Sequence, residues 1–375
     1  MKKNLLFGFV VLLGAALFMI NNVSQRGEAY DFIDHYNGAK AALSGISPYS
    51  ESVTESNQIA WYGHVARTED PQRFNYPAYS IFVFGVLTIF PPQAAIVIWT
   101  IIQLTLCMVM LNRLGRSAWA SLLILLLLRE PLSSFLLAQS TLWAAAWIGF
   151  GLIALEKRYS VRAGLCFALA SLHPVLTIPL AIIVLLRDRR ALLAFGISLL
   201  VGFGISLVAF GWWVPAWVNN LLNYSSGVNY LVWVARQFPV FIPVGGILLL
   251  VGVTRKAVWS RFSFTLSAFV LLLPLTGLYH LTLFLPMVAK MRWRWLAILT
   301  VIMWALAPQP FAIRQWEPVI LAALVLAYEF WITLIVPQKV TFPDVLRSIR
   351  HPLTTMKYLT SRLRRELAST AIELE

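Results

Sequence analysis

The stretch QAAIVIWTIIQLTLCMVMLNRLGR, residues 93–116, places a long apolar run directly before a basic cluster. A helix needs ~20 predominantly apolar residues to cross the hydrocarbon core of a bilayer. Loops on the cytoplasmic side of a membrane carry an excess of Lys and Arg. The stretch therefore predicts a membrane helix that starts at the outer face and ends at the cytoplasmic face.

The composition of the whole chain supports a membrane protein. The 375 residues are 59% hydrophobic and 12% charged, with a mean hydropathy of +0.75, which is more apolar surface than one soluble core can bury. The apolar run 4–20 has no small-residue cleavage site close behind it, so we expect an uncleaved first helix; a cleaved signal peptide is the alternative. Cys107 and Cys166 lie in apolar runs, where cysteine behaves as a small hydrophobe.

The net charge of +14 comes from short basic clusters that separate the apolar runs. Such clusters mark cytoplasmic loops, and this pattern explains the charge without a nucleic-acid partner. With the clusters inside, the remaining loops face outward, both termini are cytoplasmic, and the candidate site lies on the extracytoplasmic side. The clusters are residues 1–3, 112–116, 156–162, 187–190, 255–261 and 290–294, with more in the tail.

The predicted outer loops are residues 21–75, the neighbourhood of 130–140, 211–239, the corner at 275–280, and 308–316. The first of these loops differs from the rest of the chain because it holds seven of the sixteen acidic residues against four Lys or Arg. This concentration of carboxylates makes the first outer loop the place to look for chemistry.

Two apolar runs are too short or too interrupted to cross the membrane. Residues 76–90 lie between Tyr-Pro and Pro-Pro, so we expect them to dip into the outer leaflet. Residues 163–186 are interrupted by His173-Pro174 and have basic clusters at both ends, which predicts a hairpin of two short helices with its apex toward the outer side. Irregular backbone at membrane depth needs surrounding protein or a water-filled cavity, so both features predict a cavity that opens outward.

The expected architecture is an all-α polytopic domain, residues 1–336, with roughly 11 to 13 membrane segments and a first outer loop at 21–75. Residues 337–375 form a basic cytoplasmic tail with seven Lys or Arg. The apolar residues of this tail recur at helical spacing, which is typical of a helix on anionic lipid. A solvated tail is the alternative.

An amphipathic helix is predicted in the first outer loop. Its apolar stripe recurs at four, three, four and three residues, and this spacing predicts a helix lying flat on the outer membrane surface. Asp31 and His35 would border the stripe, with Gly38 and Ala42 leaving room for a substrate, while Asp34 would face water. An ordinary surface helix with solvated carboxylates is the alternative. The stripe is Phe32, Tyr36, Ala39, Leu43 and Ile46.

Five short motifs, met in order along residues 1–291, resemble those of a known family. The first-loop pattern from Asp31-Phe32 to Pro48-Tyr49 is similar to that of GT-C glycosyltransferases, specifically glycosyltransferase family 87, the polyprenyl-phosphate-mannose-dependent alpha-mannosyltransferases. The four others are Asn75-Tyr76-Pro77, with Ala78 for a second proline; Ala138-Gln139-Ser140-Thr141, keeping only the glutamine; Leu172-His173-Pro174, where the family has Lys-Pro; and residues 274–280 (PLTGLYH), without the family's serine and tryptophan.

The resemblance implies a GT-C fold and an inverting transfer of a hexose, with mannose the first candidate, from a polyprenyl-phosphate-linked donor to a glycolipid or glycan acceptor. It implies Asp31 as general base. The chemistry agrees, because a phosphate leaving group needs little acid assistance and one carboxylate can accept the proton of the attacking hydroxyl. Attack opposite the phosphate inverts the anomeric carbon. Asp34 is the second candidate for the base.

The remaining candidate residues would bind substrate. A leaving phosphate needs cationic or hydrogen-bonding partners, for which Arg129, His173, Arg236 and His280 are candidates. A structural role is the alternative for each, but His173 and His280 are favoured because both lie on the predicted outer side and both align with family motifs. Tyr76 and Gln139 are added on the family motifs. His35 stands beside Asp31, a pair too weak for a metal site, and we expect no metal and no cofactor.

The aromatic residues of the loop 211–239 have two readings. They form either an interfacial aromatic belt or the floor of a site for sugar and isoprene units. Glu329 lies near the cytoplasmic end of the last apolar run and is read as structural. The aromatic residues are Trp212, Trp213, Trp217, Tyr224, Tyr230 and Trp233.

Two other function classes remain alternatives to an enzyme. A transporter or flippase of a polyprenyl-linked lipid would show inverted repeats and charged groups near the bilayer midplane, whereas this chain holds its polar groups mainly in an outer loop. A scaffold would leave the ordered motifs unexplained. Convergence of Asp31, Gln139, His173 and His280 on one outward cavity would favour the enzyme.

Overall fold

The computed structural model describes residues 2–26, 31–65, 72–224, 241–272, 278–308 and 317–331, and these residues contain helices and loops without a strand. The chain divides into two compact units, Met1–Leu326 and Ala327–Glu375. The second unit includes the predicted tail, which lies outside the described residues. The α-helices are α1 Lys2–Arg26, α2 Phe32–Leu43, α3 Glu51–Tyr62, α4 Ile81–Phe84, α5 Pro92–Arg113, α6 Ala118–Leu127, α7 Arg129–Leu136, α8 Thr141–Glu156, α9 Ser160–Ala170, α10 Pro174–Leu185, α11 Arg189–Phe210, α12 Val214–Tyr224, α14 Phe241–Thr254, α15 Val258–Leu272, α16 Leu285–Val288, α17 Trp293–Leu306 and α19 Glu317–Phe330; the 3-10 helices are η1 Ala78–Ser80, η2 Gly85–Ile89 and η3 Leu278–Phe284.

Two helices, α5 and α11, are each long and apolar enough to cross a membrane. Local chemistry sets their ends. Pro92 occupies the first turn of α5, where a missing N–H costs nothing, and Gly115 follows its end with the positive φ of 86° that glycine adopts readily. The Asp188 carboxylate accepts the N–H of Ala191 at 3.0 Å and caps the start of α11.

The helices α6 and α7 together form a third candidate span, but they meet at a bend of 82°. The region of α7 is a helix and not the loop that the sequence predicts. Nine further apolar helices in the described residues are 10–17 residues long. The prediction of 11 to 13 membrane segments is therefore confirmed only in part: the described residues are all-helical, and two helices, or three if the bent pair is one span, are long and apolar enough to cross a membrane.

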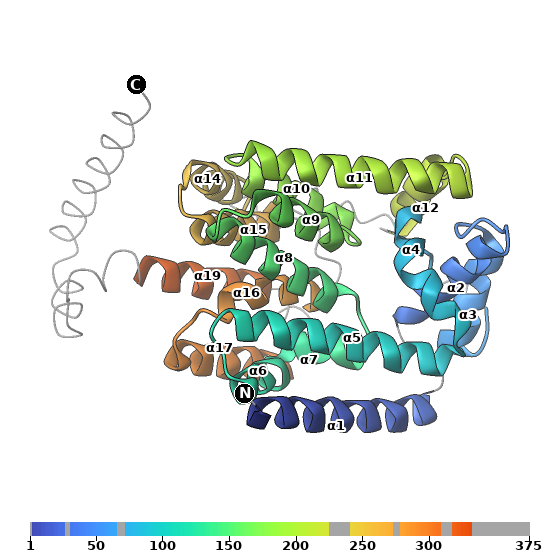
Figure 1. The fold of residues 1–375 in the computed structure, drawn as a ribbon, viewed down its shortest axis with the longest axis horizontal. Coiled ribbons are helices and arrows are strands. Elements are labelled where there is room, and N and C mark those ends of the chain that lie inside the picture. The colour runs from blue at the N-terminus through green and yellow to red at the C-terminus, as the bar shows by residue number, and fades with distance from the viewer. Residues whose placement is uncertain are drawn as a thin grey trace, which may run out of the picture. The chain divides into compact units, whose positions relative to one another are not determined.

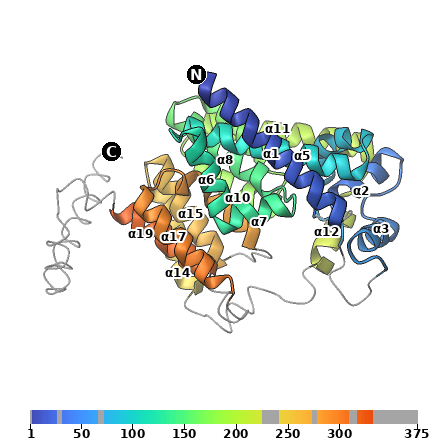
Figure 2. The same ribbon diagram turned by 90° about the horizontal axis from the view of Figure 1, so that it is seen from below.

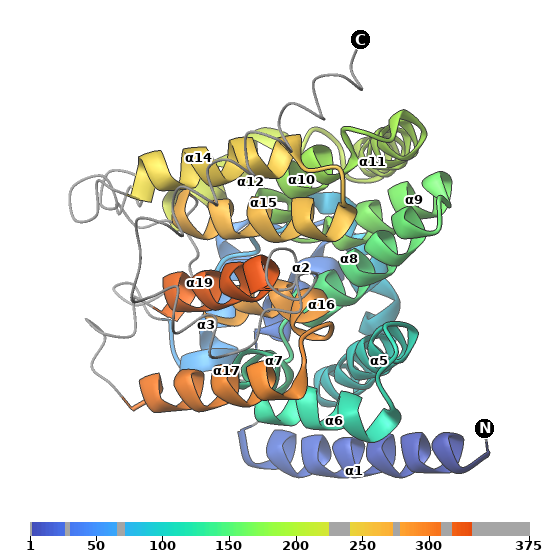
Figure 3. The same cartoon turned by 90° about the vertical axis from the view of Figure 1, so that its left-hand side faces the viewer.

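Four helices form a continuous row in which α5 packs on α8, α8 on α9 and α9 on α11 (Figure 1). The first helix, α1, packs along α5, and the pair α14 and α15 packs side by side, as Figure 3 shows. The two predicted short segments are confirmed as short. Residues 78–89 form η1, α4 and η2, while α9 and α10 are separated by a break at residues 171–173.

The basic clusters are brought together at one end of these helices. Arg116 donates to the carbonyls of Ala289 and Met291, and Lys290 lies 3.7 Å from Glu156. Ser160 donates to Asp188 at 2.7 Å, and Arg187 donates to the Thr254 carbonyl at 2.6 Å. Five clusters that are distant in sequence therefore form one connected region.

The first-loop helices gather at the opposite end of α5 and α11. Here α2 contacts α3, α4, η2 and the start of α5, while η1 contacts α11; Figure 2 shows α2, α3 and α12 at this end. The helical prediction for the stripe is confirmed from Phe32 to Leu43, whereas Ile46 lies in the bend after α2. The predicted placement of the stripe flat on a membrane surface is wrong. Phe32, Tyr36 and Ala39 are buried against protein, and only Leu43 and Ile46 are exposed.

Candidate functional site

The candidate site is built around His35, which lies in the middle of α2 and is only 1% exposed. Its ring stacks on Phe84 with centroids 4.2 Å apart and meets the edge of Tyr76 at 4.0 Å. Burial lowers the pKa of His35 from 6.5 to about 3, because desolvation penalises the charged imidazolium. His35 is therefore a neutral hydrogen-bonding group.

His173 approaches the same place from the turn between α9 and α10. Its carbonyl accepts the N–H and the hydroxyl of Thr177, at 3.0 and 2.6 Å, which fixes the start of α10. Its ring meets the edge of Tyr76 at 5.4 Å and of His280 at 5.8 Å. Burial, with smaller contributions from His280 and His35, holds the pKa of His173 well below its usual range.

Ser140 joins the two histidines, and this is the site residue that sequence reasoning missed. Its Oγ lies 3.2 Å from His35 Nε2 and 2.6 Å from His173 Nε2. The segment was singled out for Gln139, whose side chain is buried but whose described bond is a backbone one, from its N–H to the Ser134 carbonyl at 2.8 Å. Ser140 stands in the motif Ala138-Gln139-Ser140-Thr141, but no local pattern signals its bonds to histidines 105 and 33 residues away.

A tight turn presents Ser140 at the start of α8. Ala138, just before it, has a positive φ of 53°, an uncommon conformation for a residue with a Cβ. The Ala138 carbonyl accepts the indole N–H of Trp99 at 3.2 Å, and Trp99 itself packs on Phe32 with ring centroids 5.9 Å apart. The turn is thus tied to both α5 and α2.

Asp31 begins α2 one helical turn before His35. Its backbone N–H donates to the carbonyl of Leu137 at 3.2 Å, which docks the start of α2 on the end of α7. The predicted open face beside it is not present. A Cβ at Gly38 would approach the Phe74 ring to 2.3 Å, so an aromatic ring occupies the space that we assigned to substrate.

Asp34 differs from the prediction that it faces water. It is half-buried, and its Oδ1 atom is shielded from solvent. The reason is that α2 is packed among other first-loop elements and does not rest on a surface, so the side opposite its apolar stripe is partly covered as well.

Tyr76 is held in place by α12 and by the first loop. The Tyr76 carbonyl accepts the hydroxyl of Tyr49 at 2.8 Å, and the neighbouring Asn75 carbonyl accepts the indole N–H of Trp217 at 3.0 Å. Asn220, also on α12, donates to the Phe74 carbonyl at 3.4 Å. These contacts fix the ring that touches both His35 and His173.

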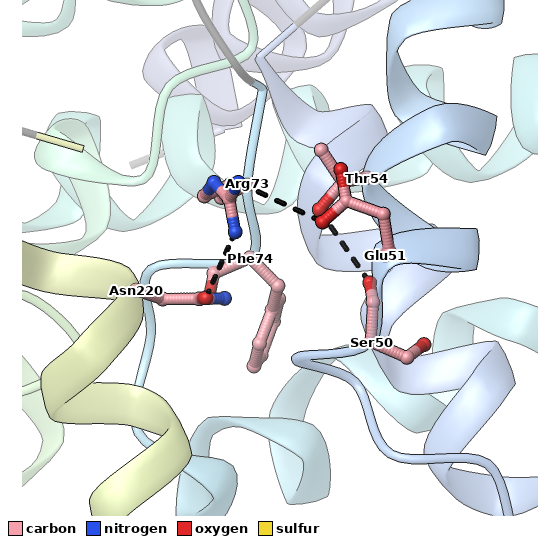
Figure 4. Close-up of polar contacts among 6 residues, drawn as sticks. All are labelled: Ser50, Glu51, Thr54, Arg73, Phe74 and Asn220. Atoms are coloured by element: carbon pink, nitrogen blue, oxygen red, sulfur yellow. Dashed lines mark hydrogen bonds and ion pairs between the residues drawn. The ribbon is translucent and has the colours of Figure 1, made fainter. Parts of the chain in front are cut away.

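A polar cluster connects the same segment to α3. Arg73 lies 3.6 Å from the Glu51 carboxylate and donates to the Asn220 side chain at 3.3 Å. Figure 4 shows Arg73 between Glu51 on α3 and Asn220 on α12. Asn220 is buried, and its bond to Arg73 joins the first loop to α12 across 147 residues of sequence.

The aromatic loop after α11 serves mainly as packing where the structure describes it. Trp213 is buried, donates to Ser206 Oγ at 3.1 Å and stacks near Tyr49 at 6.4 Å, while Trp212 is exposed. The side chain of Tyr224 and the whole of Tyr230, Trp233 and Arg236 lie outside the described residues.

The structure brings His35, Tyr76, His173 and His280 together from four separate segments. Arg129 lies at the start of α7, and Leu137, whose carbonyl bonds Asp31, follows the other end of this helix. Because a helix rises ~1.5 Å per residue, Arg129 lies roughly 12 Å from Leu137. Within the described part of the chain, no group of three or more His, Cys, Asp or Glu is arranged to hold a metal ion.

Comparison with known proteins adds no identification: no protein-family model, no curated protein and no solved structure matches this chain.

Proposed function

We propose that this chain is an inverting glycosyltransferase of the membrane, which moves a hexose from a polyprenyl-phosphate donor to a glycolipid or glycan acceptor at the outer face. The supporting observation is the convergence of His35, Tyr76, His173 and His280 around Ser140. Four of these five residues belong to the motifs that resemble the family, and the fifth, His35, lies one turn from Asp31.

In this proposal Asp31 is the general base. It accepts the proton of the acceptor hydroxyl while that oxygen attacks the anomeric carbon. The bond from this carbon to the phosphate breaks on the opposite face, and the electron pair leaves with the phosphate. Polar side chains at one end of the helices suit this reaction better than a transporter, whose site lies near the midplane between matched halves.

The histidines would hydrogen-bond the phosphate as neutral groups, because burial disfavours their charged forms. The positive charge that a phosphate requires then falls to Arg129 or Arg236. His280, which is half-buried, completes the set of candidates.

The direct test is transfer by the purified protein from a panel of radiolabelled polyprenyl-phosphate sugars to extracted membrane lipid. We expect one hexose donor to be consumed. Asp31→Asn should lower turnover by at least ~10²-fold, the scale of general-base catalysis, and leave donor binding unchanged.

Asp34→Asn is the matched control, since it removes the second carboxylate of the same helix. Loss of turnover in Asp34→Asn alone would transfer the role of base to Asp34. If no donor is consumed by the wild-type protein, or if neither substitution affects transfer, the proposed function is wrong.

A further inference from the structure

Within the described part of the chain, the buried hydroxyl of Ser140 has the two histidine rings as its hydrogen-bond partners. The residue is fully buried, and Oγ lies within hydrogen-bond distance of His35 Nε2 and His173 Nε2. A serine hydroxyl offers one hydrogen and two lone pairs. Its hydrogen must point at one ring nitrogen, and the other nitrogen must donate its own hydrogen to Oγ.

The shared hydroxyl forces the two rings into opposite tautomers. A neutral imidazole carries one N–H and one bare nitrogen. If Ser140 donates to His173, then His173 holds its hydrogen on Nδ1, while His35 donates from Nε2 and leaves its Nδ1 bare. The reverse arrangement swaps both rings. In either case the two Nδ1 atoms differ, one being a donor and the other an acceptor.

The second ring nitrogen of His35, Nδ1, lacks a hydrogen-bond partner among the described residues. His35 Nδ1 is shielded from solvent and accepts or donates no hydrogen bond within the described residues. An unpaired buried polar atom is costly, on the order of 1–3 kcal/mol, and a catalytic role or a bound water or ion is the usual explanation for one in a native structure. Asp31 lies four residues earlier on α2, and side chains at this spacing have Cβ atoms ~5–6 Å apart.

We propose that His35, Ser140 and His173 form a proton relay that carries the acceptor's proton from Asp31 to the leaving phosphate. For the identity of its two end groups the relay rests on the proposed function. The chain of hydrogen bonds itself rests on the geometry.

Each step of the relay moves one proton between named atoms. The acceptor hydroxyl gives its proton to Asp31, which passes it to Nδ1 of His35. The Nε2 proton of His35 moves to Ser140 Oγ, and the hydroxyl proton of Ser140 moves to Nε2 of His173. The Nδ1 proton of His173 goes to an oxygen of the departing phosphate. Both rings exchange tautomers, and proton exchange with water after product release restores them.

The tautomers can be measured directly on the full chain in detergent, without substrate. The chain has five histidines, so ¹⁵N-histidine labelling gives a small spectrum in which protonated and bare ring nitrogens are well separated. Single His→Gln substitutions assign the signals. We expect His35 to carry its hydrogen on Nε2 and His173 to carry its hydrogen on Nδ1, and Ser140→Ala to abolish this pairing. The reverse assignment overturns the relay, because a protonated Nδ1 of His35 cannot accept the proton of Asp31.

Ser134→Ala is the matched control. Ser134 is also fully buried and its hydroxyl bonds Thr282 at 2.8 Å and Thr141 at 2.9 Å. This change removes a buried serine hydroxyl close to Ser140 in sequence and should leave both histidine tautomers as they are. A purely structural effect of losing a hydroxyl would appear in both variants.

Turnover provides the second readout. Ser140→Ala should lower the rate of transfer by about 10²-fold or more, as expected for a lost proton-transfer path, and Ser140→Thr, which keeps a hydroxyl, should recover most of it. Ser134→Ala should stay near the wild-type rate.

The outcomes separate the relay from the proposed function. Equal tautomers in the two rings, or identical spectra for wild type and Ser140→Ala, overturn the relay whatever the transfer assay shows. Full turnover in Ser140→Ala overturns the relay and leaves the glycosyltransferase proposal intact. If the wild-type protein transfers no sugar, the proposed function and the phosphate end of the relay are wrong, and the tautomers alone decide whether the hydrogen-bonded chain exists.

Discussion

Gly38 shows how packing within the protein can require a small residue at a position that the sequence suggested was open to substrate. The sequence suggested open space beside Asp31, yet a Cβ at this position would lie 2.3, 2.7 and 2.9 Å from three atoms of the Phe74 ring. These distances are far inside van der Waals contact. Phe74 is fully buried and lies two residues before Tyr76, so a displaced ring would disturb the site.

We expect Gly38→Ala to lower the stability of the folded protein by about 1–3 kcal/mol, the usual cost of overpacking a core. Gly196→Ala on α11 is the control, because nothing lies within 4 Å of a Cβ there and alanine favours a helix by ~1 kcal/mol over glycine. Thermal unfolding in detergent measures both variants. Equal unfolding temperatures for the two would contradict the close packing of α2 on Phe74.

The buried His35 makes stability dependent on pH. Its pKa in the folded chain is about 3, below the 6.5 of the exposed side chain. Between these values the unfolded chain binds more protons than the folded chain, so stability is fully present above pH 6.5 and is lost as pH falls toward 3. The slope from one such group reaches about 1.4 kcal/mol per pH unit. His173 acts in the same direction.

We expect His35→Gln to show a shallower loss of stability than wild type when unfolding is followed from pH 7 to pH 4, because one of the buried titrating groups has been removed. His64→Gln, which replaces an exposed histidine, is the control and should follow the wild-type curve. Parallel curves for wild type and His35→Gln would show that His35 is not desolvated in the folded protein.

At the scale of helices, the basic residues do more than mark sidedness. Arg261 on α15 is 3% exposed and donates to the carbonyl of Val184 at 2.7 Å, near the end of α10. It also donates to the carbonyls of Arg255 at 3.0 Å and Lys256 at 3.1 Å, just after α14. Carbonyls in the last turn of a helix lack intrahelical partners, and one guanidinium satisfies three acceptors here.

Arg261→Lys should lower stability by about 1.5–3 kcal/mol, the value of a hydrogen bond to a charged group. A lysine keeps the charge, but its single ammonium cannot reach carbonyls on two elements as a planar guanidinium does. Arg294→Lys, at an exposed position in the first turn of α17, keeps the charge in the same way and should leave stability unchanged. Denaturant unfolding in detergent compares the two, and equal midpoints would exclude the clamp.

The elements also show what sequence reasoning could and could not predict. Periodicity predicted the helix of the first loop, and proline positions predicted the short segment at 78–89 and the break before Pro174, because these signals are local. Periodicity cannot say whether an apolar stripe meets lipid or protein, which is why the placement of α2 was wrong. The bonds from Ser140 to His35 and His173 span 105 and 33 residues, and no local pattern encodes them.

At the scale of the whole first unit, the two ends of the helices differ in chemistry. The helix α8 starts beside Ser140 and ends at Glu156, and α10 starts beside His173 and ends near Arg187. The histidine cluster and the connected basic region therefore sit at opposite ends of the same helices. Basic loops remain on the cytoplasmic side during insertion, so this arrangement supports an outward-facing site.

Single cysteines can test this orientation, on a background in which Cys107 and Cys166 are replaced. The residue next to the hairpin apex, Leu172, is unsuitable because it is only 4% exposed. Ser44 follows α2 and Lys157 follows α8, and both are exposed. A membrane-impermeant maleimide added to intact cells should label Ser44→Cys, since the first loop faces outward in this topology, and should label Lys157→Cys only after the membrane is opened, because cytoplasmic loops carry the basic clusters. The reverse pattern would place the histidine cluster inside the cell and exclude transfer at the outer face. Labelling of both positions from outside would mean that the chain crosses the membrane an even number of times between Ser44 and Lys157, and the predicted cytoplasmic side of the basic loop at 156–162 would be wrong.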